Sequence, residues 1–192
     1  MLAASKMRSA DEVREAYGAG IRVFGENYVV ELSAKAPTLP QAEWHLIGHL
    51  QRNKVPKVVG TAALVQSLDS VRLADELDRA ARLRGVVQPV LLEVNVAGEA
   101  SKSGLALAEV HSLARQVASL SALELRGLMT MPPPRGDPRP FYDTARDLRD
   151  GLAEMLGRPL PVLSFGMSDD LEAAIACGST LVRVGTAVFG PR

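Results

Sequence analysis

A lysine close to the amino terminus of this sequence could serve as a nucleophile. Lys6 follows the short apolar run Leu2–Ser5, which has the composition of a buried strand. Apolar surroundings would remove water from its ammonium group and favour the neutral amine, which forms a Schiff base with an aldehyde. A lysine at the end of a strand is often just a solvated surface residue, so Lys6 becomes a candidate only in combination with other groups.

Two junctions near the carboxyl terminus could bind a phosphate group. In each, a short apolar strand ends in glycine and a small hydroxyl residue, and we expect a helix to begin at once; the first is Gly166-Met167-Ser168 and the second is Gly185-Thr186. The first backbone N–H groups of a helix are unpaired and carry a partial positive charge, which suits an anion. Two such junctions in adjacent units predict a phosphate site made by the last two loops of a barrel.

Arg183 lies in the apolar sequence Leu181–Val184, two residues before Gly185. An unpaired guanidinium is costly in such surroundings, so we expect an anion or an acceptor beside it. An unprotonated pyridine nitrogen would serve, and the permanent charge of the guanidinium would then disfavour ring protonation and weaken carbanion chemistry. A ring that carries both an aldehyde for Lys6 and a phosphate is pyridoxal 5′-phosphate.

Other polar residues are less decisive. Asn27 could hydrogen-bond a ring substituent or cap a helix, and the two interpretations compete evenly. His45 and His49 suggest a metal, but no carboxylate or third histidine keeps a matching spacing, so metal binding is disfavoured. Further residues after the fifth and sixth strands are expected to line the same opening: Asn95, Lys102, Ser103, Met129, Thr130 and Met131.

Short β-rich runs alternate with helical runs along the whole chain. The strand candidates are Leu2–Ser5, Ile21–Phe24, Trp44–Ile47, Ala63–Ser67, Pro89–Val94, Leu123–Leu128, Val162–Ser164 and Thr180–Arg183. Because helix-length segments separate them, the sheet should be parallel, and eight units close naturally into a (β/α)8 TIM-type barrel. An open doubly wound sheet remains the alternative.

The helices that surround this sheet have clear signals. Apolar residues follow a helical rhythm over Val71–Arg84, and Ser9 with Glu12 forms a capping box for the first helix. Gly104–Leu120 and Pro140–Leu156 are the later helices. The proline-rich segment Met131–Pro138 can continue neither a strand nor a helix, and it is either an ordinary connection or a lid.

The size and charge of the chain exclude several classes of protein. Its 192 residues suit one domain, residues 1–192, and the 22 basic residues balance the 22 acidic ones. This balance argues against nucleic acid or an anionic membrane as a partner, and no apolar run is long enough to span a membrane. Cys177 is the single cysteine, which suggests a cytoplasmic protein, and we expect it to be a buried structural thiol.

The sequence resembles the pyridoxal phosphate homeostasis protein family over essentially its whole length. The matching motifs are Ala4-Ser5-Lys6, Phe24-Gly25-Glu26-Asn27-Tyr28, Trp44-His45-Leu46-Ile47-Gly48, Leu68-Asp69-Ser70, Lys102-Ser103-Gly104, Gly127-Leu128-Met129, Gly166-Met167-Ser168-Asp169-Asp170 and Val182-Arg183-Val184-Gly185-Thr186. The resemblance implies a single barrel like the N-terminal domain of alanine racemase. It also implies a cofactor-binding protein without established catalytic activity, which acts in the intracellular homeostasis of pyridoxal phosphate (vitamin B6).

The resemblance also implies roles for individual residues. Lys6 would carry pyridoxal 5′-phosphate as an aldimine, and Arg183 would face the ring nitrogen. Ser168, Gly185 and Thr186 would hold the phosphate, with Met167 in the same loop, and Asn27 would lie against the cofactor. Enzymes that depend on the cofactor, in their unloaded form, are the partners to which it could be passed.

Two departures from related proteins bear on function. Family members usually have a helix before the first strand, which this sequence lacks. Racemases with this barrel also have a second domain that supplies a tyrosine base, and of the three tyrosines here we expect only Tyr28 near the opening. A pyridoxal-phosphate-dependent racemase or related enzyme remains an alternative, and so does a sugar-phosphate enzyme that uses Lys6 without a cofactor.

Overall fold

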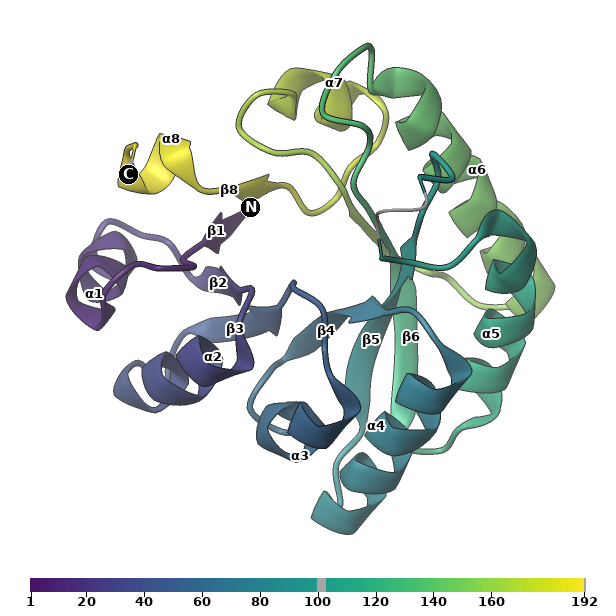
Figure 1. Cartoon of the computed structure of the whole chain (residues 1–192), viewed down its shortest axis with the longest axis horizontal. Coiled ribbons are helices and arrows are strands. Elements are labelled where there is room, and N and C mark those ends of the chain that lie inside the picture. The colour runs from purple at the N-terminus through teal and green to yellow at the C-terminus, as the bar shows by residue number, and fades with distance from the viewer. Residues whose placement is uncertain (100–102, 192) are drawn as a thin grey trace.

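The structure is a computed structural model that describes residues 1–99 and 103–191. Eight parallel strands form one sheet in the order β7-β6-β5-β4-β3-β2-β1-β8. They are β1 (Leu2–Ala4), β2 (Val23–Glu26), β3 (Glu43–Leu46), β4 (Leu64–Leu68), β5 (Gln88–Val94), β6 (Leu123–Thr130), β7 (Val162–Ser164) and β8 (Arg183–Val184). In Figure 1 the strands surround the centre and the helices lie outside them. The predicted (β/α)8 barrel is confirmed, and the open doubly wound alternative is wrong.

The helices alternate with the strands as expected. They are α1 (Ala10–Gly18), α2 (Val29–Lys35), α3 (Val55–Val58), α4 (Val71–Arg84), α5 (Leu107–Ser119), α6 (Arg139–Leu156), α7 (Leu171–Ala176) and α8 (Thr186–Phe189), with short 3-10 turns at Ala36–Thr38 and Arg52–Lys54. The capping box of α1 is present, because the Glu12 N–H donates to the Ser9 hydroxyl and the Ser9 N–H donates to the Glu12 carboxylate. None of the helices in the described ranges is long and apolar enough to cross a membrane.

One predicted helix begins later than expected. The sequence predicts a helix that begins at Gly104, but α5 begins at Leu107. Gly104 has a left-handed backbone, with φ of 107°, and Leu105 forms a β-bridge with Val94 at the end of β5. The chain thus returns to the sheet before it turns into the helix.

The barrel closes weakly between β7 and β8. β8 pairs with β1 through Leu2↔Arg183 and Ala3↔Val184, whereas on the other side the one β-bridge to β7 in the described ranges, Ser164↔Leu181, is made by a residue that precedes β8. The predicted strand Thr180–Arg183 therefore begins too early. The Thr180 hydroxyl accepts the Leu163 N–H at 2.8 Å, so a side chain takes the place of a ladder bond there.

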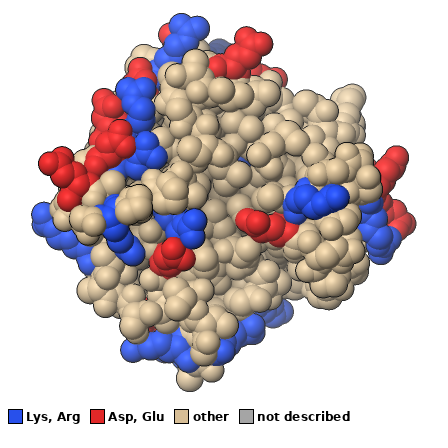
Figure 2. Space-filling view, turned by 180° about the vertical axis from the view of Figure 1, so that it is seen from behind, with Lys and Arg blue, Asp and Glu red and all other residues tan. Residues whose placement is uncertain are grey.

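Two apolar clusters fill the fold. The larger one lies between the sheet and the helices, and Cys177 belongs to it as a buried free thiol, as predicted. The smaller one joins Leu64, Leu91 and Met129 from three successive strands. Figure 2 shows basic and acidic side chains close to one another at the edge of one face and also nearer its centre, with wide areas of neither type between them, in keeping with the balanced composition.

Gly127 allows β6 and β7 to approach each other. Its φ is 151°, and a Cβ atom at this position would lie 1.8 Å from the Val162 carbonyl oxygen on β7. No side chain fits without separating the two backbones. The sequence of β6 therefore requires glycine at this point.

Replacing Gly127 by alanine should lower the free energy of unfolding by about 2–4 kcal/mol, because strain and a backbone clash add. Gly151, in α6, is the matched control, since a Cβ there would have no neighbour within 4 Å. Gly151→Ala should stabilise the chain by about 0.5–1 kcal/mol. Urea unfolding measures both changes, and a Gly127→Ala protein as stable as the natural one would contradict the close approach of β6 and β7.

Candidate functional site

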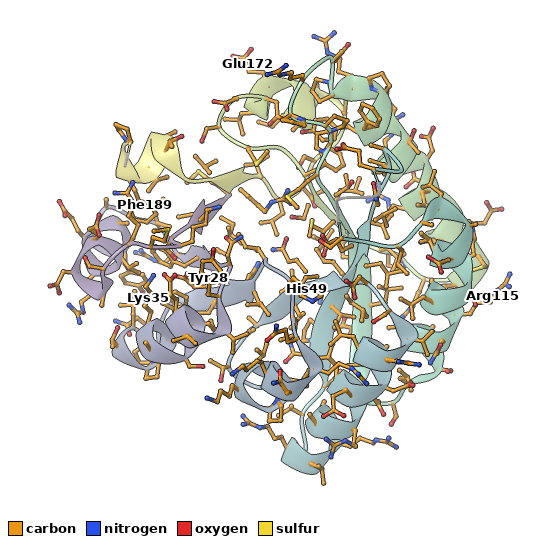
Figure 3. The ribbon with its side chains drawn as sticks, in the orientation of Figure 1. Tyr28, Lys35, His49, Arg115, Glu172 and Phe189 are labelled. Atoms are coloured by element: carbon orange, nitrogen blue, oxygen red, sulfur yellow. The ribbon has the colours of Figure 1, made fainter. Side chains whose placement is uncertain are left out.

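A cavity of about 650 Å³ opens where the strands end in their loops. Its lining contains all seven residues that the sequence singled out for cofactor binding: Lys6, Asn27, Met167, Ser168, Arg183, Gly185 and Thr186. These residues come from both ends of the chain, and the barrel brings them together because β1 lies beside β8. Figure 3 shows His49, another lining residue, towards the centre of the molecule and Arg115 and Glu172 on outer helices.

The turn that carries Lys6 is held on both sides of the lysine. The Ser5 hydroxyl donates to Glu26 at 2.7 Å, and the Ser5 carbonyl accepts from the Lys35 ammonium at 2.8 Å. On the other side, the Met7 N–H donates to the Glu31 carboxylate at 2.7 Å. Met7 has a φ of 61°, which is uncommon for a residue with a side chain. These bonds hold the strained turn in place, and Lys6 is half-buried at its tip.

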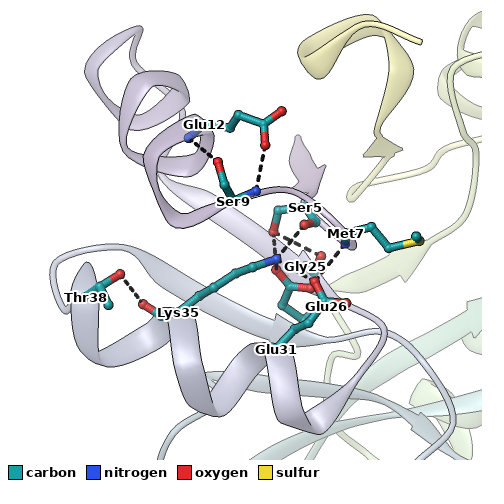
Figure 4. A network of polar contacts seen from close by, with 9 residues as sticks. All are labelled: Ser5, Met7, Ser9, Glu12, Gly25, Glu26, Glu31, Lys35 and Thr38. Atoms are coloured by element: carbon teal, nitrogen blue, oxygen red, sulfur yellow. Dashed lines mark hydrogen bonds and ion pairs between the residues drawn. The ribbon is translucent and has the colours of Figure 1, made fainter. Parts of the chain in front are cut away.

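The anchor of this turn is a buried cluster of charges (Figure 4). The Lys35 ammonium on α2 donates to Glu26 at 2.9 Å and to Glu31 at 2.6 Å. Burial raises the pKa of Glu26, although the hydrogen bonds from Lys35 and Ser5 oppose this effect. The cluster therefore connects the end of β2 and the first turns of α2 to the loop after β1.

Asn27 lies at the wall of the cavity and does not cap the helix. Tyr28 is the residue before α2, and its side chain makes no capping bond. A Cβ atom on Gly48 would lie 2.3 Å from the Asn27 carbonyl oxygen, so the loops after β2 and β3 are in close backbone contact. The capping interpretation of Asn27 is therefore wrong, and the glycine in the third loop fixes the position of its backbone.

The two predicted phosphate-binding loops meet. The Thr186 hydroxyl donates to the Ser168 hydroxyl at 3.2 Å. The second loop has the expected form, with Gly185 directly before α8. The first does not, because α7 begins at Leu171 and a turn follows Ser168. The Asp170 carboxylate accepts the Met167 N–H at 2.6 Å and so stabilises this turn.

Arg183 lies at the floor of the cavity and is 5% exposed. Its guanidinium donates to the carbonyl and the hydroxyl of Ser164, both at 2.8 Å, and to the Thr130 carbonyl at 3.1 Å. Burial lowers the pKa of Arg183 to about 10, which leaves the side chain charged at neutral pH. The sequence predicts an acceptor beside this guanidinium, and oxygen atoms of β6 and β7 supply part of it.

Glu93 is a lining residue that the sequence analysis missed. It is 4% exposed, one carboxylate oxygen accepts the Ser103 hydroxyl at 2.8 Å, and the other, Oε2, has no hydrogen-bond partner. Burial raises the pKa of Glu93, with the nearby charge of Asp69 adding to the effect and that of Arg183 opposing it. A single carboxylate within the apolar run Leu91–Val94 was the signal that could have identified it.

Several other expected residues lie elsewhere. Asn95 bonds the Glu99 backbone instead of lining this cavity, and Met129 belongs to the inner apolar cluster. Thr130 contributes its carbonyl to Arg183 and not its side chain to the lining, whereas Ser103 and Met131 do line the cavity. Lys102 lies outside the described residues.

His45 and His49 contact different residues. His45 is buried against Glu43 and Gln66, while His49 is mostly exposed, 3.6 Å from Asp69. In the part of the chain that the structure describes, no group of three potential ligands could hold a metal ion. Tyr28 is exposed and lines a neighbouring cavity, and the described lining of the main cavity contains no tyrosine.

The proline-rich loop borders the site. Pro132–Pro134 line a second cavity of about 650 Å³, which shares Ser103, Met131, Met167 and Asp169 with the first. The loop thus lies beside the opening of the main cavity.

The sequence matches known proteins along its length. The family model described as alanine racemase, N-terminal domain, matches residues 3–192. The pyridoxal phosphate homeostasis protein of Aquifex aeolicus is 43% identical over 197 residues, covering 100% of this chain and 86% of the relative. The protein of the same name from Mus musculus is 41% identical over 209 residues, covering 100% of this chain and 76% of the relative.

Solved structures are similar as well. PipY of Synechococcus elongatus PCC7942, in a structure with pyridoxal phosphate bound, is 36% identical with a TM-score of 0.91; the match covers 99% of this chain and 92% of PipY. Alanine racemase of Clostridium difficile 630 has a TM-score of 0.81 at 10% identity, covering 100% of this chain and 52% of the enzyme. At that identity the second likeness concerns the fold alone.

The raised pKa of Glu93 predicts how stability depends on pH. Below about pH 4.5 its carboxyl group is protonated in both the folded and the unfolded chain, so its ionisation does not lower the free energy of unfolding there. As the pH rises towards the higher pKa of the folded state, the unfolded chain ionises first and stability falls. Glu93→Gln, which cannot ionise, should therefore gain stability relative to the natural protein between about pH 4.5 and neutrality.

Urea unfolding of the cofactor-free proteins across this pH range measures the difference. We expect it to grow with pH and then to level off. A difference that stays constant with pH would contradict a raised pKa at Glu93.

Proposed function

Because the chain belongs to the alanine racemase N-terminal domain family, and within it to the pyridoxal phosphate homeostasis proteins, we propose that it binds pyridoxal 5′-phosphate in the main cavity. Lys6 is the point of covalent attachment, as a Schiff base with the aldehyde. The observation that carries this proposal is that an amine, a buried guanidinium and a pair of hydroxyl groups line one cavity of about 650 Å³.

The residues present fit the chemical groups of this cofactor. The hydroxyls of Ser168 and Thr186, 3.2 Å apart, can both turn their protons to phosphate oxygens, which are strong acceptors. The ring nitrogen is an acceptor, and three of the five N–H groups of Arg183 are already engaged with β6 and β7. Its remaining donors can therefore serve the nitrogen without rearrangement of the barrel. The aldehyde needs an amine, which Lys6 supplies from the loop after β1.

The same residues favour holding the cofactor over using it in catalysis. Bound pyridoxal phosphate supplies an electron sink that works best when the ring nitrogen is protonated. Arg183, which stays charged at neutral pH, disfavours a proton there. The described lining also offers no tyrosine as a second base. We therefore favour a carrier of pyridoxal phosphate that acts in the cytoplasm and passes the cofactor to enzymes that lack it.

Lys6 should become labelled when the protein is mixed with pyridoxal phosphate and treated with borohydride, which fixes a Schiff base as a stable amine. Peptide mass mapping locates the adduct, and the unreduced mixture should be yellow. Lys6→Ala should lose both signals. Lys57→Ala, which changes an exposed lysine on α3, should keep them. An adduct on Lys54 and none on Lys6 would refute the attachment site.

Ser168→Ala and Thr186→Ala should each weaken pyridoxal phosphate binding about ten- to a hundredfold, since each removes a hydrogen bond to a charged group worth about 1.5–3 kcal/mol. The matched controls are Ser119→Ala and Thr144→Ala, whose hydroxyls bond carbonyls within outer helices. Both controls should bind as the natural protein does in a fluorescence or absorbance titration. Unchanged affinity in both site variants would place the phosphate elsewhere.

A further inference from the structure

A chain of hydrogen bonds crosses the interior of the barrel and ends at Arg183. It runs through buried side chains on four strands: Arg183 on β8, Ser164 on β7, Gln66 on β4 and His45 on β3. The Arg183 Nη1 to Ser164 Oγ distance is 2.8 Å, and the Ser164 Oγ to Gln66 Oε1 distance is 2.6 Å. The Gln66 Nε2 to His45 Nδ1 distance is 2.9 Å. The step from Ser164 to Gln66 joins β7 to β4, two strands that are not neighbours in the sheet.

The chain ends at a carboxylate at the other end of the barrel. His45 Nε2 lies 2.7 Å from Glu43 Oε1. Glu43 begins β3 and lines a cavity of about 230 Å³, together with residues that lie at or just before the starts of other strands, such as Ala63 and Val162. The hydrogen bond from His45 lowers the pKa of Glu43, which keeps this end of the chain negative.

The direction of this hydrogen-bonded chain follows from the Gln66 amide group, whose oxygen faces Ser164 and whose nitrogen faces His45. A guanidinium only donates, so Ser164 accepts from Arg183 and has its own proton free for Gln66 Oε1. The amide group of Gln66 then presents its N–H to His45 Nδ1, which must be unprotonated to accept it. The ring proton of His45 therefore lies on Nε2 and is donated to Glu43.

We propose that Ser164, Gln66 and His45 are positioning residues for Arg183: they bind its guanidinium into a polarised chain that starts at the cavity floor and ends at Glu43. Donors that all point the same way polarise one another and strengthen each bond. The chain thus fixes one edge of the guanidinium, and with it the direction of the N–H groups that face the cavity. The proposal rests on the proposed function, in which those groups meet the ring nitrogen of pyridoxal phosphate.

The direction of the chain can be tested without any cofactor. Long-range ¹H–¹⁵N NMR distinguishes the two neutral forms of a histidine ring. The protein has three histidines, and the signals of His45 are assigned as those that disappear in His45→Gln. We expect the Nε2–H form for His45 at neutral pH. A ring protonated on Nδ1, alone or together with Nε2, would overturn the proposed direction.

The positioning role is tested with an analogue of pyridoxal phosphate in which a C–H group replaces the ring nitrogen. The natural protein should prefer the true cofactor about ten- to a hundredfold, the value of one hydrogen bond to a charged group. Gln66→Met breaks the chain and should reduce this preference to about a fewfold, while its affinity for inorganic phosphate stays unchanged. Gln116→Met, which loses only a bond to Asp75 on the outside, should keep the full preference.

These measurements separate the two proposals. If the natural protein does not bind pyridoxal phosphate, the proposed function fails. The tautomer of the His45 ring still tests the direction of the hydrogen-bonded chain. If binding is normal and Gln66→Met keeps the full preference for the true cofactor, the positioning role is refuted and the function stands. Ser164→Ala breaks the same chain with a smaller change, and it takes the place of Gln66→Met if that variant does not fold.

Discussion

The mouth of the barrel depends on one buried cation. In the described ranges, β7 and the segment that leads into β8 meet at a single β-bridge, and the Arg183 guanidinium strengthens this seam by donating to Ser164 on β7 and Thr130 on β6. A buried guanidinium that lost such partners would cost about 3–5 kcal/mol, so the two strands are held where their carbonyls can accept. The same bonds fix the positive charge at the floor of the cavity. Closure of the sheet and the electrostatics of the site are thus consequences of one interaction.

The position of Lys6 depends on a different cluster, and on a helix that does not line the cavity. Ser5 and Met7 are tied to Lys35, Glu26 and Glu31, so the ends of α2 and β2 determine where the turn after β1 can lie. Ion pairs of this kind add little to stability, because desolvation offsets their attraction. Their effect here is geometric: they hold a residue with positive φ next to the lysine and leave the lysine itself without a role in the anchor.

Local patterns in the sequence were sufficient to find the eight strands, though not the exact bounds of each, and to find residues that follow their ends. Lys6 and Thr186 could be placed at one opening because parallel strands of a barrel end on the same side. The roles of Glu93 and Gln66 could not be predicted in this way. They depend on hydrogen-bond partners, Ser103 and Ser164, that only the folded chain brings near. The start of α7 was misjudged for a local reason, because the Asp170 carboxylate takes the Met167 N–H and extends the turn.

The pairing of Leu2 with Arg183 makes the first and last strands neighbours, and this has a consequence for how the protein is made. A ribosome makes Lys6 long before it makes Ser168, Arg183 and Thr186. Contacts between residues so far apart in sequence also form slowly, because a long loop must close first. A nascent chain therefore exposes its lysine long before it has a cavity, and loading with the proposed cofactor has to wait until the last strand has paired with the first.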